Sequence, residues 1–393
     1  MSCVFIIAGE PSGDILGARV MASLKTRSTQ AIEFHGVGGT AMTEQGLSSI
    51  FPMSDLTVMG LAEVLPKLPQ LLKRIKQAAN MVVECQPDVV VTIDAPDFCF
   101  RVAKRVKAAN PSLPIVHLVA PTVWAWRPGR AKRVAGYLDH MLCLLPFEPP
   151  YFEKEGLPAT FIGHPVIESG ADQGNGALFR KAHDIPPEAL LLAVLPGSRA
   201  GEVSRHLPIF RETARKLAER HRGLICVFAT VPHVADQVRQ ETLGWPTPII
   251  SIDGAADDGK EKYGAFSAAN VALAASGTVS VELALAGCPS VIAYRVNPVT
   301  AAMAKRLIKV EFASLINLIA DRSILPEFIQ ERCHPESLCA AVSTLLSDQA
   351  ARSAQTAAFT QTLASLGQGG PPPSDRAADA ILTYITKDEK SAD

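Results

Sequence analysis

The 393-residue sequence predicts an α/β fold made of two doubly wound domains, each with a parallel sheet between layers of helices. Short apolar runs of strand length alternate with longer segments of helical periodicity along most of the chain. A Gly-rich segment over 163–176 interrupts this alternation, and the chain length suits two cores. We therefore expect an N-terminal domain over 1–166, a second domain over 167–366, and a C-terminal helix and tail over 367–393.

Most of the apolar runs that predict strands are followed by a helical pattern. The predicted strands cover 3–8, 34–37, 89–93, 115–119, 141–145, 190–195, 224–229, 249–252, 271–275 and 290–294. Helical connections between strands favour parallel sheets with right-handed crossovers. Ligands of such sheets bind beyond the carboxyl ends of the strands, so the two domains are expected to face each other across a ligand-binding cleft.

Composition excludes several classes of protein. Hydrophobic residues make up 48% of the chain and charged residues 20%, and the net charge of −1 gives no global reason to expect nucleic acid. No apolar run reaches the roughly 18 residues that a membrane-spanning helix needs, and a strand rather than a signal peptide is predicted first. The eight cysteines include no Cys-x-x-Cys pair, which argues against a disulfide framework or a zinc site and suits a reducing cytosol.

The best candidate for a phosphate site follows the predicted strand that begins at Val271. This strand leads into Ser276-Gly277-Thr278 and then into a helical pattern. Free N–H groups and the positive end of a helix dipole at such a turn attract a phosphate or diphosphate. Glu282 lies four residues after Thr278 on the same helix face, where it could accept bonds from ribose hydroxyls. The alternative is an ordinary strand–turn–helix unit with a surface glutamate.

A second turn in the same domain, Pro196-Gly197-Ser198-Arg199, also follows a predicted strand. Its arginine places a guanidinium at a strand end, where it suits bidentate contact with a diphosphate. Together the two turns favour a site for a nucleotide diphosphate. No Asp-x-Asp pattern stands where a metal-dependent sugar transferase needs one, so no metal is expected. The charge of a leaving group would then be met by arginine and helix dipole.

Two strand ends of the first domain carry acidic residues. The first strand leads into a Gly-Glu10-Pro-Ser-Gly-Asp14 turn, whose glycine spacing differs from the Gly-x-Gly-x-x-Gly fingerprint of dinucleotide sites. Either Glu10 or Asp14 could meet sugar hydroxyls, although Asp14 could equally support a helix start. A later strand delivers Asp94, a candidate general base for an attacking hydroxyl, whereas Asp97 better fits a helix cap.

An amphipathic segment in the first domain has two interpretations. Its apolar residues at helical spacing are Leu68, Leu71, Leu72, Ile75 and Ala79, and its cations are Lys67, Lys73, Arg74 and Lys76. The apolar run 58–65 precedes it. One interpretation is a helix that covers a sheet. The other is a membrane-facing or acyl-binding surface, with its cations near anionic lipid.

The segment 120–133 combines aromatic and basic side chains. It holds two of the three tryptophans, Trp124 and Trp126, beside four cations. Such a segment could bind a phosphorylated, partly apolar ligand. Nucleic acid is the alternative partner, although a single patch in a neutral chain supports it weakly.

Motifs spread in order over nearly the whole chain resemble those of the lipid-A-disaccharide synthase family. They are Ala8-Gly-Glu-Pro-Ser-Gly-Asp14, Val58-Met-Gly60, Ile93-Asp-Ala-Pro-Asp-Phe98, Pro121-Thr-Val-Trp-Ala-Trp-Arg127, Leu195-Pro-Gly-Ser-Arg199, Ala275-Ser-Gly-Thr278 and Leu315-Ile-Asn-Leu-Ile-Ala320. The resemblance implies two Rossmann-like domains in the GT-B glycosyltransferase fold. It also implies an inverting enzyme that works without metal or other cofactor.

The reaction implied by the resemblance joins UDP-2,3-diacylglucosamine to 2,3-diacylglucosamine 1-phosphate through a β-1,6 bond and releases UDP. The family works at the cytoplasmic face of the inner membrane, as a peripheral protein. It further implies that the C-terminal helix returns to the first domain, and it admits homodimers formed by exchange of C-terminal parts.

Carried over residue by residue, the resemblance makes Asp94 the base, places Glu10 near the acceptor and turns Arg199 toward the leaving diphosphate. The donor site that it implies consists of Ser198, Arg199, Ser276, Gly277, Thr278, Glu282 and Asn317. The sequence departs from the family at Ile316, where the family usually has proline. This departure puts the backbone position of Asn317 in question.

Three other functions are weighed against this one. A UDP-N-acetylglucosamine 2-epimerase, the main alternative, would share the fold and donor site but would need neither an acyl surface nor an acceptor. An NAD oxidoreductase would need the missing glycine fingerprint, and an exported sugar-binding protein would need a signal peptide. Release of UDP only in the presence of both acylated substrates would separate the synthase from all three.

Overall fold

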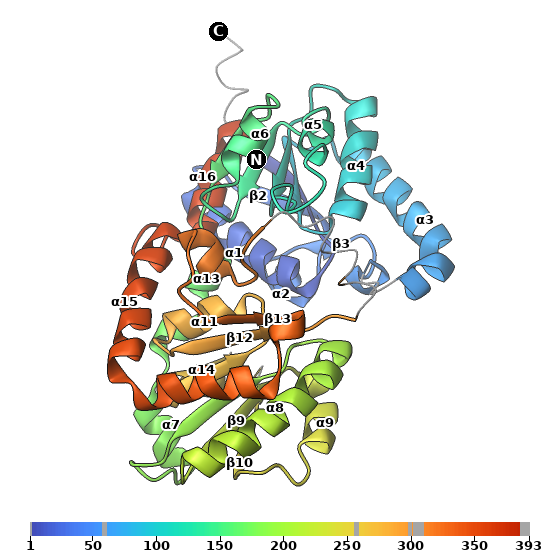
Figure 1. Cartoon of the computed structure of the whole chain (residues 1–393). Helices are drawn as coiled ribbons and strands as arrows, with labels where there is room; N and C mark the ends of the chain where they lie inside the picture. The colour runs from blue at the N-terminus through green and yellow to red at the C-terminus, as the bar shows by residue number, and fades with distance from the viewer. Residues whose placement is uncertain (1, 57–60, 255–258, 298–300, 302–309, 386–393) are drawn as a thin grey trace. The chain divides into compact units, whose positions relative to one another are not determined.

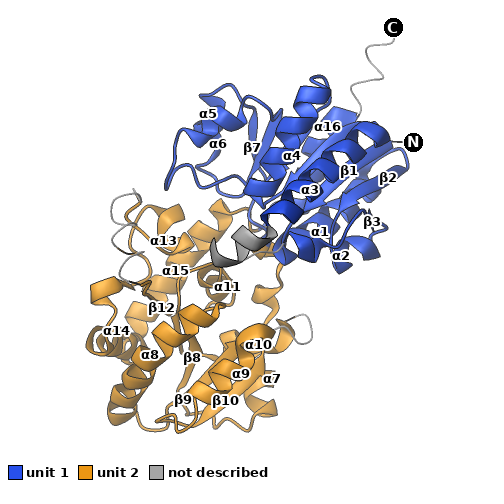
Figure 2. Ribbon diagram, turned by 90° about the vertical axis from the view of Figure 1, so that its right-hand side faces the viewer, with its two compact units in different colours: residues 1–165, 369–393 blue, residues 166–368 orange. Residues whose placement is uncertain are grey.

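The computed structural model describes residues 2–56, 61–254, 259–297, 301 and 310–385, and for 61–67 it describes the backbone but not the side chains. The chain divides into two compact units, which Figure 2 colours separately. Unit 1 comprises residues 1–165 and 369–393, and unit 2 comprises residues 166–368. Each unit contains its own parallel sheet with helices on both faces, which confirms the predicted fold class.

The sheet of unit 1 has seven parallel strands in the order β3-β2-β1-β4-β5-β6-β7 (Figure 1). The strands are β1 (Ser2–Ala8), β2 (Ile32–Val37), β3 (Ser48–Ser49), β4 (Val89–Ile93), β5 (Ile115–Leu118), β6 (His140–Cys143) and β7 (Ala159–Phe161). The helices of this unit are α1 (Pro11–Arg27), α2 (Thr40–Glu44), α3 (Leu61–Cys85), α4 (Pro96–Ala109), α5 (Arg130–Val134), α6 (Pro149–Glu153) and α16 (Pro373–Ile385).

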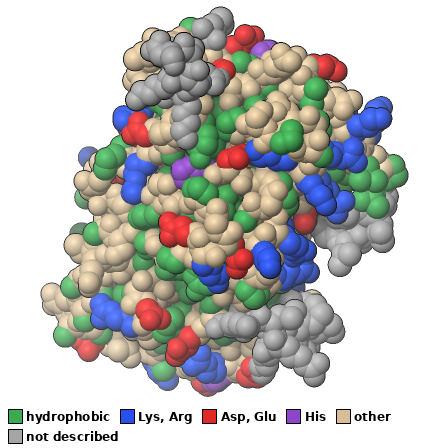
Figure 3. All heavy atoms as spheres, turned by 90° about the horizontal axis from the view of Figure 1, so that it is seen from above, with side chains coloured by type: hydrophobic (Ala, Val, Ile, Leu, Met, Phe, Trp, Pro, Cys, Tyr) green, Lys and Arg blue, Asp and Glu red, His purple; other side chains and the backbone are tan. Residues whose placement is uncertain are grey.

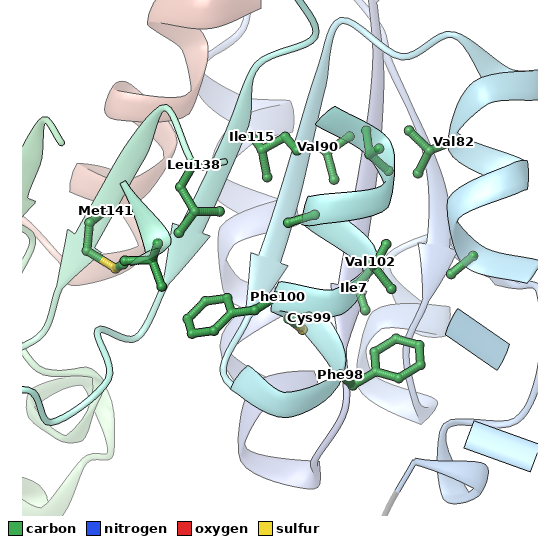
Figure 4. Packing of buried hydrophobic residues seen from close by; sticks show 14 of the residues in the cluster. Ile7, Val82, Val90, Phe98, Cys99, Phe100, Val102, Ile115, Leu138 and Met141 are labelled. Atoms are coloured by element: carbon green, nitrogen blue, oxygen red, sulfur yellow. The ribbon is translucent and has the colours of Figure 1, made fainter. Parts of the chain in front are cut away.

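Both faces of this sheet are buried. Helices α3, α4 and α5 contribute to the core on one face, where Val82, Val90 and Val102 lie close together in Figure 4. Helices α1, α2 and α16 contribute to the core on the other face. The C-terminal helix α16 is tied to α1 by a bidentate ion pair between Arg27 and Asp379, with N–O distances of 2.6 and 2.7 Å. Burial on both faces explains why these strands read as continuous apolar runs in the sequence.

The sheet of unit 2 has six parallel strands in the order β10-β9-β8-β11-β12-β13. The strands are β8 (Leu191–Leu195), β9 (Ile225–Thr230), β10 (Ile249–Asp253), β11 (Val271–Ala274), β12 (Ser290–Tyr294) and β13 (Glu327–Ile329). The helices described in this unit are α7 (Gly176–Ala182), α8 (Ala200–Arg220), α9 (Pro232–Glu241), α10 (Lys260–Ala268), α11 (Val279–Leu285), α13 (Leu315–Ala320), α14 (Pro335–Ser347) and α15 (Gln349–Ser365).

All ten predicted strands are present, with ends shifted by at most two residues. The short strands β3, β7 and β13 are absent from the prediction, because each lies at a sheet edge and is too short to give an apolar run. In both sheets the strand order reverses once, between β1 and β4 in unit 1 and between β8 and β11 in unit 2. Such a switch point is where doubly wound sheets bind ligands.

Candidate active site

The switch point of unit 1 brings the predicted Glu10 and Asp94 to neighbouring strand ends. Ala8 of β1 lies opposite Ile93 of β4, so the residues that follow both strands leave the sheet side by side. A Cβ atom on Gly9 would come within 2.6 Å of the Ala95 side chain, so the two turns are in close contact. Only glycine at this position allows the Glu10 turn to approach the Asp94 turn so closely.

The turn that presents Asp94 is strained. Asp94 and Ala95 have φ angles of 49° and 41°, in the left-handed region that costs a non-glycine residue roughly 1–3 kcal/mol. The turn is held by the Asp94 N–H, which donates to the Leu118 carbonyl at 2.9 Å, and by the Ala95 carbonyl, which accepts from Phe98 and Cys99 in the first turn of α4. Strain of this kind persists where the surrounding structure fixes it, as is common at functional sites.

The environment of Asp94 suits a general base. Burial raises the pKa of Asp94, and a hydrogen bond from the Ala95 backbone opposes this only in part. A carboxylate with a raised pKa is a stronger proton acceptor, and its pKa lies nearer to the pH at which enzymes work. This perturbation identifies Asp94 as a functional candidate on physical grounds, independently of any family motif.

The other two carboxylates considered for this site have different surroundings. The side chain of Asp97 is 98% exposed and lies 3.6 Å from a guanidinium nitrogen of Arg130. Asp14 is buried, and its carboxylate accepts hydrogen bonds of 2.7, 3.0 and 3.1 Å from three backbone N–H groups around the start of α2. The prediction that Asp14 could meet a sugar is therefore wrong, because its oxygens already cap α2.

A pocket of about 350 Å³ lies against Glu10 and the turn after Asp94. Its opposite wall is apolar and comes mainly from α3, with Leu56, Leu68, Leu71, Leu72 and Ile75. Leu68 and Leu72 are 39% and 42% exposed, whereas Ile75 belongs to the core. The apolar run predicted over 58–65, together with Lys67, lies outside the residues whose side chains are described.

The cations expected beside this apolar surface have separate roles. Lys73 and Lys76 are exposed. Arg74 instead forms an ion pair with Asp55 at 2.7 Å and stacks on the Phe51 ring with 4.8 Å between the guanidinium carbon and the ring centroid. Arg74 is therefore part of the packing of α3, and among the α3 cations whose side chains are described, Lys73 and Lys76 are available to an anionic surface.

The switch point of unit 2 presents the turn that contains Ser198 and Arg199. Gly197 has a φ of 122°, and a Cβ atom there would lie 2.6 Å from the Glu202 carboxylate. That carboxylate accepts the Ser198 N–H at 3.2 Å and the Arg199 side chain at 3.2 Å. The Arg199 side chain is nevertheless 68% exposed, so most of its guanidinium donors remain accessible to an anion.

A buried histidine, which the sequence does not single out, fixes this turn. His206 on α8 donates from Nδ1 to the Pro196 carbonyl at 2.6 Å, and its Nε2 accepts the Arg295 N–H at 2.9 Å. Burial lowers the pKa of His206, which keeps the ring neutral and allows both contacts. The histidine thus joins the turn after β8 to the end of β12, over a separation that no local pattern reveals.

The second turn of unit 2 exposes Gly277 and Thr278 but holds Ser276. The Ser276 hydroxyl donates to the Ala313 carbonyl at 2.7 Å, and a Cβ atom on Gly277 would have no neighbour within 4 Å. Thr278 is exposed at the start of α11. The backbone at Gly277 is therefore free to lie against a ligand.

Glu282 is held by two residues of α10. One oxygen, Oε1, accepts Lys262 Nζ at 2.8 Å and the Tyr263 hydroxyl at 3.2 Å. Burial acts to lower the pKa of Lys262, but the charge and hydrogen bond of Glu282 outweigh it, so the pKa of Lys262 is raised. Lys262 is thus held in its charged form. The second oxygen of Glu282 has no hydrogen bond to any residue that the structure describes.

Asn317 is buried and fully engaged with its own unit. Its Nδ2 donates to the Leu325 carbonyl and to Glu327, and its Oδ1 accepts the N–H groups of Ile324 and Leu325, all at 2.8 Å. These bonds fix the chain after α13 without the proline that the family usually has. Its amide therefore has no hydrogen-bonding group left for a nucleotide sugar. Any role of Asn317 in the nucleotide-sugar site would be one of positioning other residues.

The fold is similar to those of solved structures. MurG from Acinetobacter baumannii is 13% identical with a TM-score of 0.57 over 98% of this chain and all of that one. A UDP-N-acetylglucosamine 2-epimerase from Neisseria meningitidis, solved with UDP-GlcNAc, is 11% identical with a TM-score of 0.61 over the same shares. At these identities the likeness concerns the fold, and together with the two parallel sheets it places the chain in the GT-B class.

Sequence comparison identifies the family within that class. A family model described as lipid-A-disaccharide synthetase matches residues 4–372. Lipid-A-disaccharide synthases from Rhodospirillum centenum and Paramagnetospirillum magneticum are 55% and 47% identical, and the alignments cover at least 95% of each chain. The chain belongs to the lipid-A-disaccharide synthase family. It is a glycosyltransferase of lipid A biosynthesis, and the epimerase alternative is not favoured.

Proposed function

We propose that this protein transfers a 2,3-diacylglucosaminyl group from UDP to the 6-hydroxyl of 2,3-diacylglucosamine 1-phosphate, with inversion at the anomeric carbon. Family membership supports the reaction class, and the perturbed Asp94 carboxylate at the unit 1 switch point supports the chemistry. In this proposal the acceptor binds to unit 1 and the UDP-sugar binds to unit 2.

In the proposed step, Asp94 removes the proton of the acceptor hydroxyl as its oxygen attacks the anomeric carbon of the donor. One C–O bond forms, the bond between that carbon and the diphosphate breaks, and UDP leaves with the bonding electron pair. Glu10, on the wall of the pocket beside the Asp94 turn, would accept a hydrogen bond from the acceptor sugar. The strained turn keeps the carboxylate in place, so little reorganisation accompanies the reaction.

The donor would be held by the two turns of unit 2. The exposed guanidinium of Arg199 offers paired N–H donors to the diphosphate, and the turn at Gly277 lets backbone approach it closely. The free oxygen of Glu282 would accept the ribose hydroxyls. Lys262 and Tyr263 hold its other oxygen, so the side chain is already oriented before the nucleotide binds.

The acyl chains would contact the apolar wall that α3 contributes to the unit 1 pocket. Leu68 and Leu72 are exposed there, with Lys73 on the same helix. We propose that this surface also places the protein peripherally at the cytoplasmic face of the inner membrane. In the described part of the chain, no helix combines the length and apolarity needed to cross a bilayer. A homodimer is a further implication of the family, which light scattering of the purified protein would test.

The decisive experiment is an assay of UDP release with each substrate alone and with both together. The proposed function requires UDP only when both acylated sugars are present, together with a disaccharide product. Release of UDP from UDP-N-acetylglucosamine alone, or epimerisation of that sugar, would instead support the alternative on the same fold. Asp94→Asn should abolish most of the two-substrate reaction, which ties the activity to the proposed base.

A further inference from the structure

A second pocket of unit 1, with a volume of about 400 Å³, is strongly cationic. It lies between the first half of α4 and the segment that leads into α5. Its charged lining residues are Arg101, Lys104, Arg127, Arg130, Arg133 and Asp97. In Figure 3, Lys and Arg side chains gather beside hydrophobic ones toward the right-hand edge of the view, the side on which Figure 1 draws α3 and α4.

The positive charge of this pocket is not neutralised within the protein. Asp97 lies 3.6 Å from Arg130, but its carboxylate is 98% exposed, and water screens it strongly. Among the residues that the structure describes, no carboxylate lies within 4.0 Å of the side-chain nitrogens of Arg101, Lys104, Arg127 or Arg133. Five cations gathered around one exposed carboxylate raise the free energy of the unliganded protein, which an anion in the pocket would lower.

Aromatic packing holds two of the guanidinium groups in place. Arg130 stacks on Phe100 at 5.2 Å from the ring centroid, and Arg127 stacks on Trp126 at 4.1 Å. The side chain of Arg130 is only 18% exposed, so it loses little conformational entropy when it binds a ligand. The backbone also links the two arginines, because the Arg130 N–H donates to the Arg127 carbonyl at 2.9 Å. Fixed, planar guanidinium groups favour the bidentate recognition of phosphate oxygens.

Hydrogen bonds to Glu148 anchor the loop that carries Arg127. Trp124 donates from its indole N–H to Glu148 at 3.0 Å, and Glu148 also accepts the N–H groups of Leu144 and Leu145 after β6. Arg127 itself has a φ of 55°, in the left-handed region. The tryptophans of this segment therefore act as supports that present the arginines, so the pattern predicted to bind a phosphorylated ligand has a structural basis.

The cationic pocket and the apolar one share part of their lining. Pro96, Asp97 and Arg101 line both of them, so a single ligand can occupy both. A ligand that fits this combination carries a phosphate at one end and hydrocarbon at the other. A phosphomonoester has a charge of about −1.5 to −2 at neutral pH, which matches the excess of cations better than a phosphodiester with a single charge.

We infer that the cationic pocket is the subsite for the phosphomonoester of the acceptor lipid. This inference rests on the proposed function, in which the acceptor is a diacylated sugar 1-phosphate bound to unit 1. The acyl chains would lie against α3 and the phosphate between α4 and α5, with the sugar near the Asp94 turn and the start of α4, which lines both pockets. A phospholipid headgroup of the bilayer shares the same phosphate chemistry and is the competing source.

The test uses the double variant Arg101→Gln/Arg133→Gln and the matched control Arg105→Gln/Lys132→Gln. The control removes the same number of exposed cations from α4 and α5, but its residues do not line the pocket. UDP release is measured in neutral detergent with 2,3-diacylglucosamine 1-phosphate and with the same lipid bearing a free 1-hydroxyl. Thermal unfolding of both variants establishes that they are folded, and Arg130→Lys repeats the test with the charge kept but the fork geometry lost.

The subsite predicts that the pocket variant raises KM for the phosphorylated acceptor about 10- to 100-fold, since two charge-assisted contacts are lost. KM for the donor, and for the acceptor without phosphate, should change less than about twofold, as should all constants of the control. Equal losses for both acceptors, or no loss, would overturn the inference. Loss of binding to phosphatidylglycerol vesicles with an unchanged KM in detergent would assign the pocket to the bilayer and also overturn it. If the wild-type protein releases no UDP when both substrates are present, the proposed function fails instead.

Discussion

The two switch points differ in how their polar groups are satisfied. In unit 2, Glu282 is held by Lys262 and Tyr263, and Arg199 by Glu202. In unit 1, burial raises the pKa of Asp94, and the neighbouring pocket gathers cations around one exposed carboxylate. In unit 2 each of these polar side chains is anchored by a neighbour before any ligand arrives, whereas unit 1 keeps a destabilised base and an excess of positive charge.

This difference corresponds to the ligands that we propose. A nucleotide presents hydroxyls and a diphosphate at fixed positions, so side chains that are already oriented bind it with little loss of entropy. An acylated sugar phosphate presents hydrocarbon chains. The apolar surface that binds these chains also keeps water away from Asp94, the neighbouring base. Desolvation at unit 1 therefore serves the chemistry directly, because it makes Asp94 a stronger proton acceptor.

The largest expected effect follows removal of the base. Asp94→Asn keeps the size of the side chain but removes the proton acceptor, so kcat should fall by roughly 10²- to 10⁴-fold, as general-base loss usually does. UDP affinity, measured by calorimetry, should stay close to wild type because UDP is assigned to the other unit. Asp172→Asn is the control and should keep most of the activity, since Asp172 is exposed and lies in the other unit. A near-normal rate for Asp94→Asn would remove it from the role.

The same variant gives two pH signatures. The ionised base forms only above the raised pKa of Asp94, so kcat/KM of the wild type should fall as pH decreases, with a midpoint above the ordinary aspartate value of 3.8. A pKa that is higher in the folded state gives a stability contribution that is complete below pH 3.8 and is lost as pH rises through the folded-state pKa. Asp94→Asn should therefore have a higher Tm than wild type at pH 8. A lower Tm there would contradict the desolvated carboxylate.

The next effect concerns the diphosphate. Arg199→Ala should reduce kcat/KM by about 100-fold, since one preorganised charge contact is worth about 3 kcal/mol in the transition state. Arg239→Ala is a closely matched control, because Arg239 is 70% exposed and also pairs with a carboxylate three residues away on its own helix. Steady-state kinetics of the two variants should differ clearly. Equal kinetics would mean that Arg199 is an ordinary surface arginine.

The sequence predicts the frame of both sites well. A strand such as Val89–Ile93 is buried on both faces, so it appears as a continuous apolar run, and the residue that follows it must lie at the carboxyl edge of the sheet. Asp94 and Arg199 are found in this way from chain order alone. The doubly wound topology then brings these residues to the switch points, because β1 and β8 are each flanked by strands from the two halves of their sheet.

What the sequence does not predict depends on contacts between distant residues. The Asn317 amide donates hydrogen bonds to Leu325 and Glu327, and Glu282 accepts a hydrogen bond from a lysine that lies 20 positions away. Helical periodicity places Leu72 and Ile75 on one face of α3, but it does not show where that face leaves the core. These properties belong to the packed structure, and no local spacing encodes them.

A smaller effect is expected at the ribose. If the free oxygen of Glu282 accepts ribose hydroxyls, Glu282→Gln should weaken UDP binding about 10-fold, the usual value of one hydrogen bond to a charged group. The affinity for 2′-deoxy-UDP should change less, because that nucleotide keeps only its 3′-hydroxyl as a donor to the carboxylate. Glu261→Gln on α10, whose carboxylate pairs with His183 at 3.0 Å, is the control and should leave both affinities unchanged. Equal losses for the two nucleotides would assign Glu282 a purely structural role.

The smallest effect distinguishes the exposed apolar residues of α3 from the buried ones. Leu72 is 42% exposed, whereas Ile75 is 3% exposed and belongs to the core. Leu72→Ser should weaken cosedimentation with anionic vesicles and raise KM for the acylated acceptor, with little change in Tm. Ile75→Ala should instead lower the free energy of unfolding by about 2–5 kcal/mol, because it leaves a cavity. Val83→Ser, an exposed position on the same helix, is the control for polarity alone.

Charge on this surface adds a final distinction. Lys73→Glu should weaken vesicle binding by about 1 kcal/mol for each unit of charge changed, and the loss should shrink as salt is added, since surface attraction is screened within a Debye length. Arg74→Glu is unsuitable for this test, because it would also break the ion pair with Asp55 that packs α3. Vesicle binding that is unchanged in both Leu72→Ser and Lys73→Glu would mean that α3 meets the acyl chains only within the pocket. Membrane attachment would then depend on a surface other than α3.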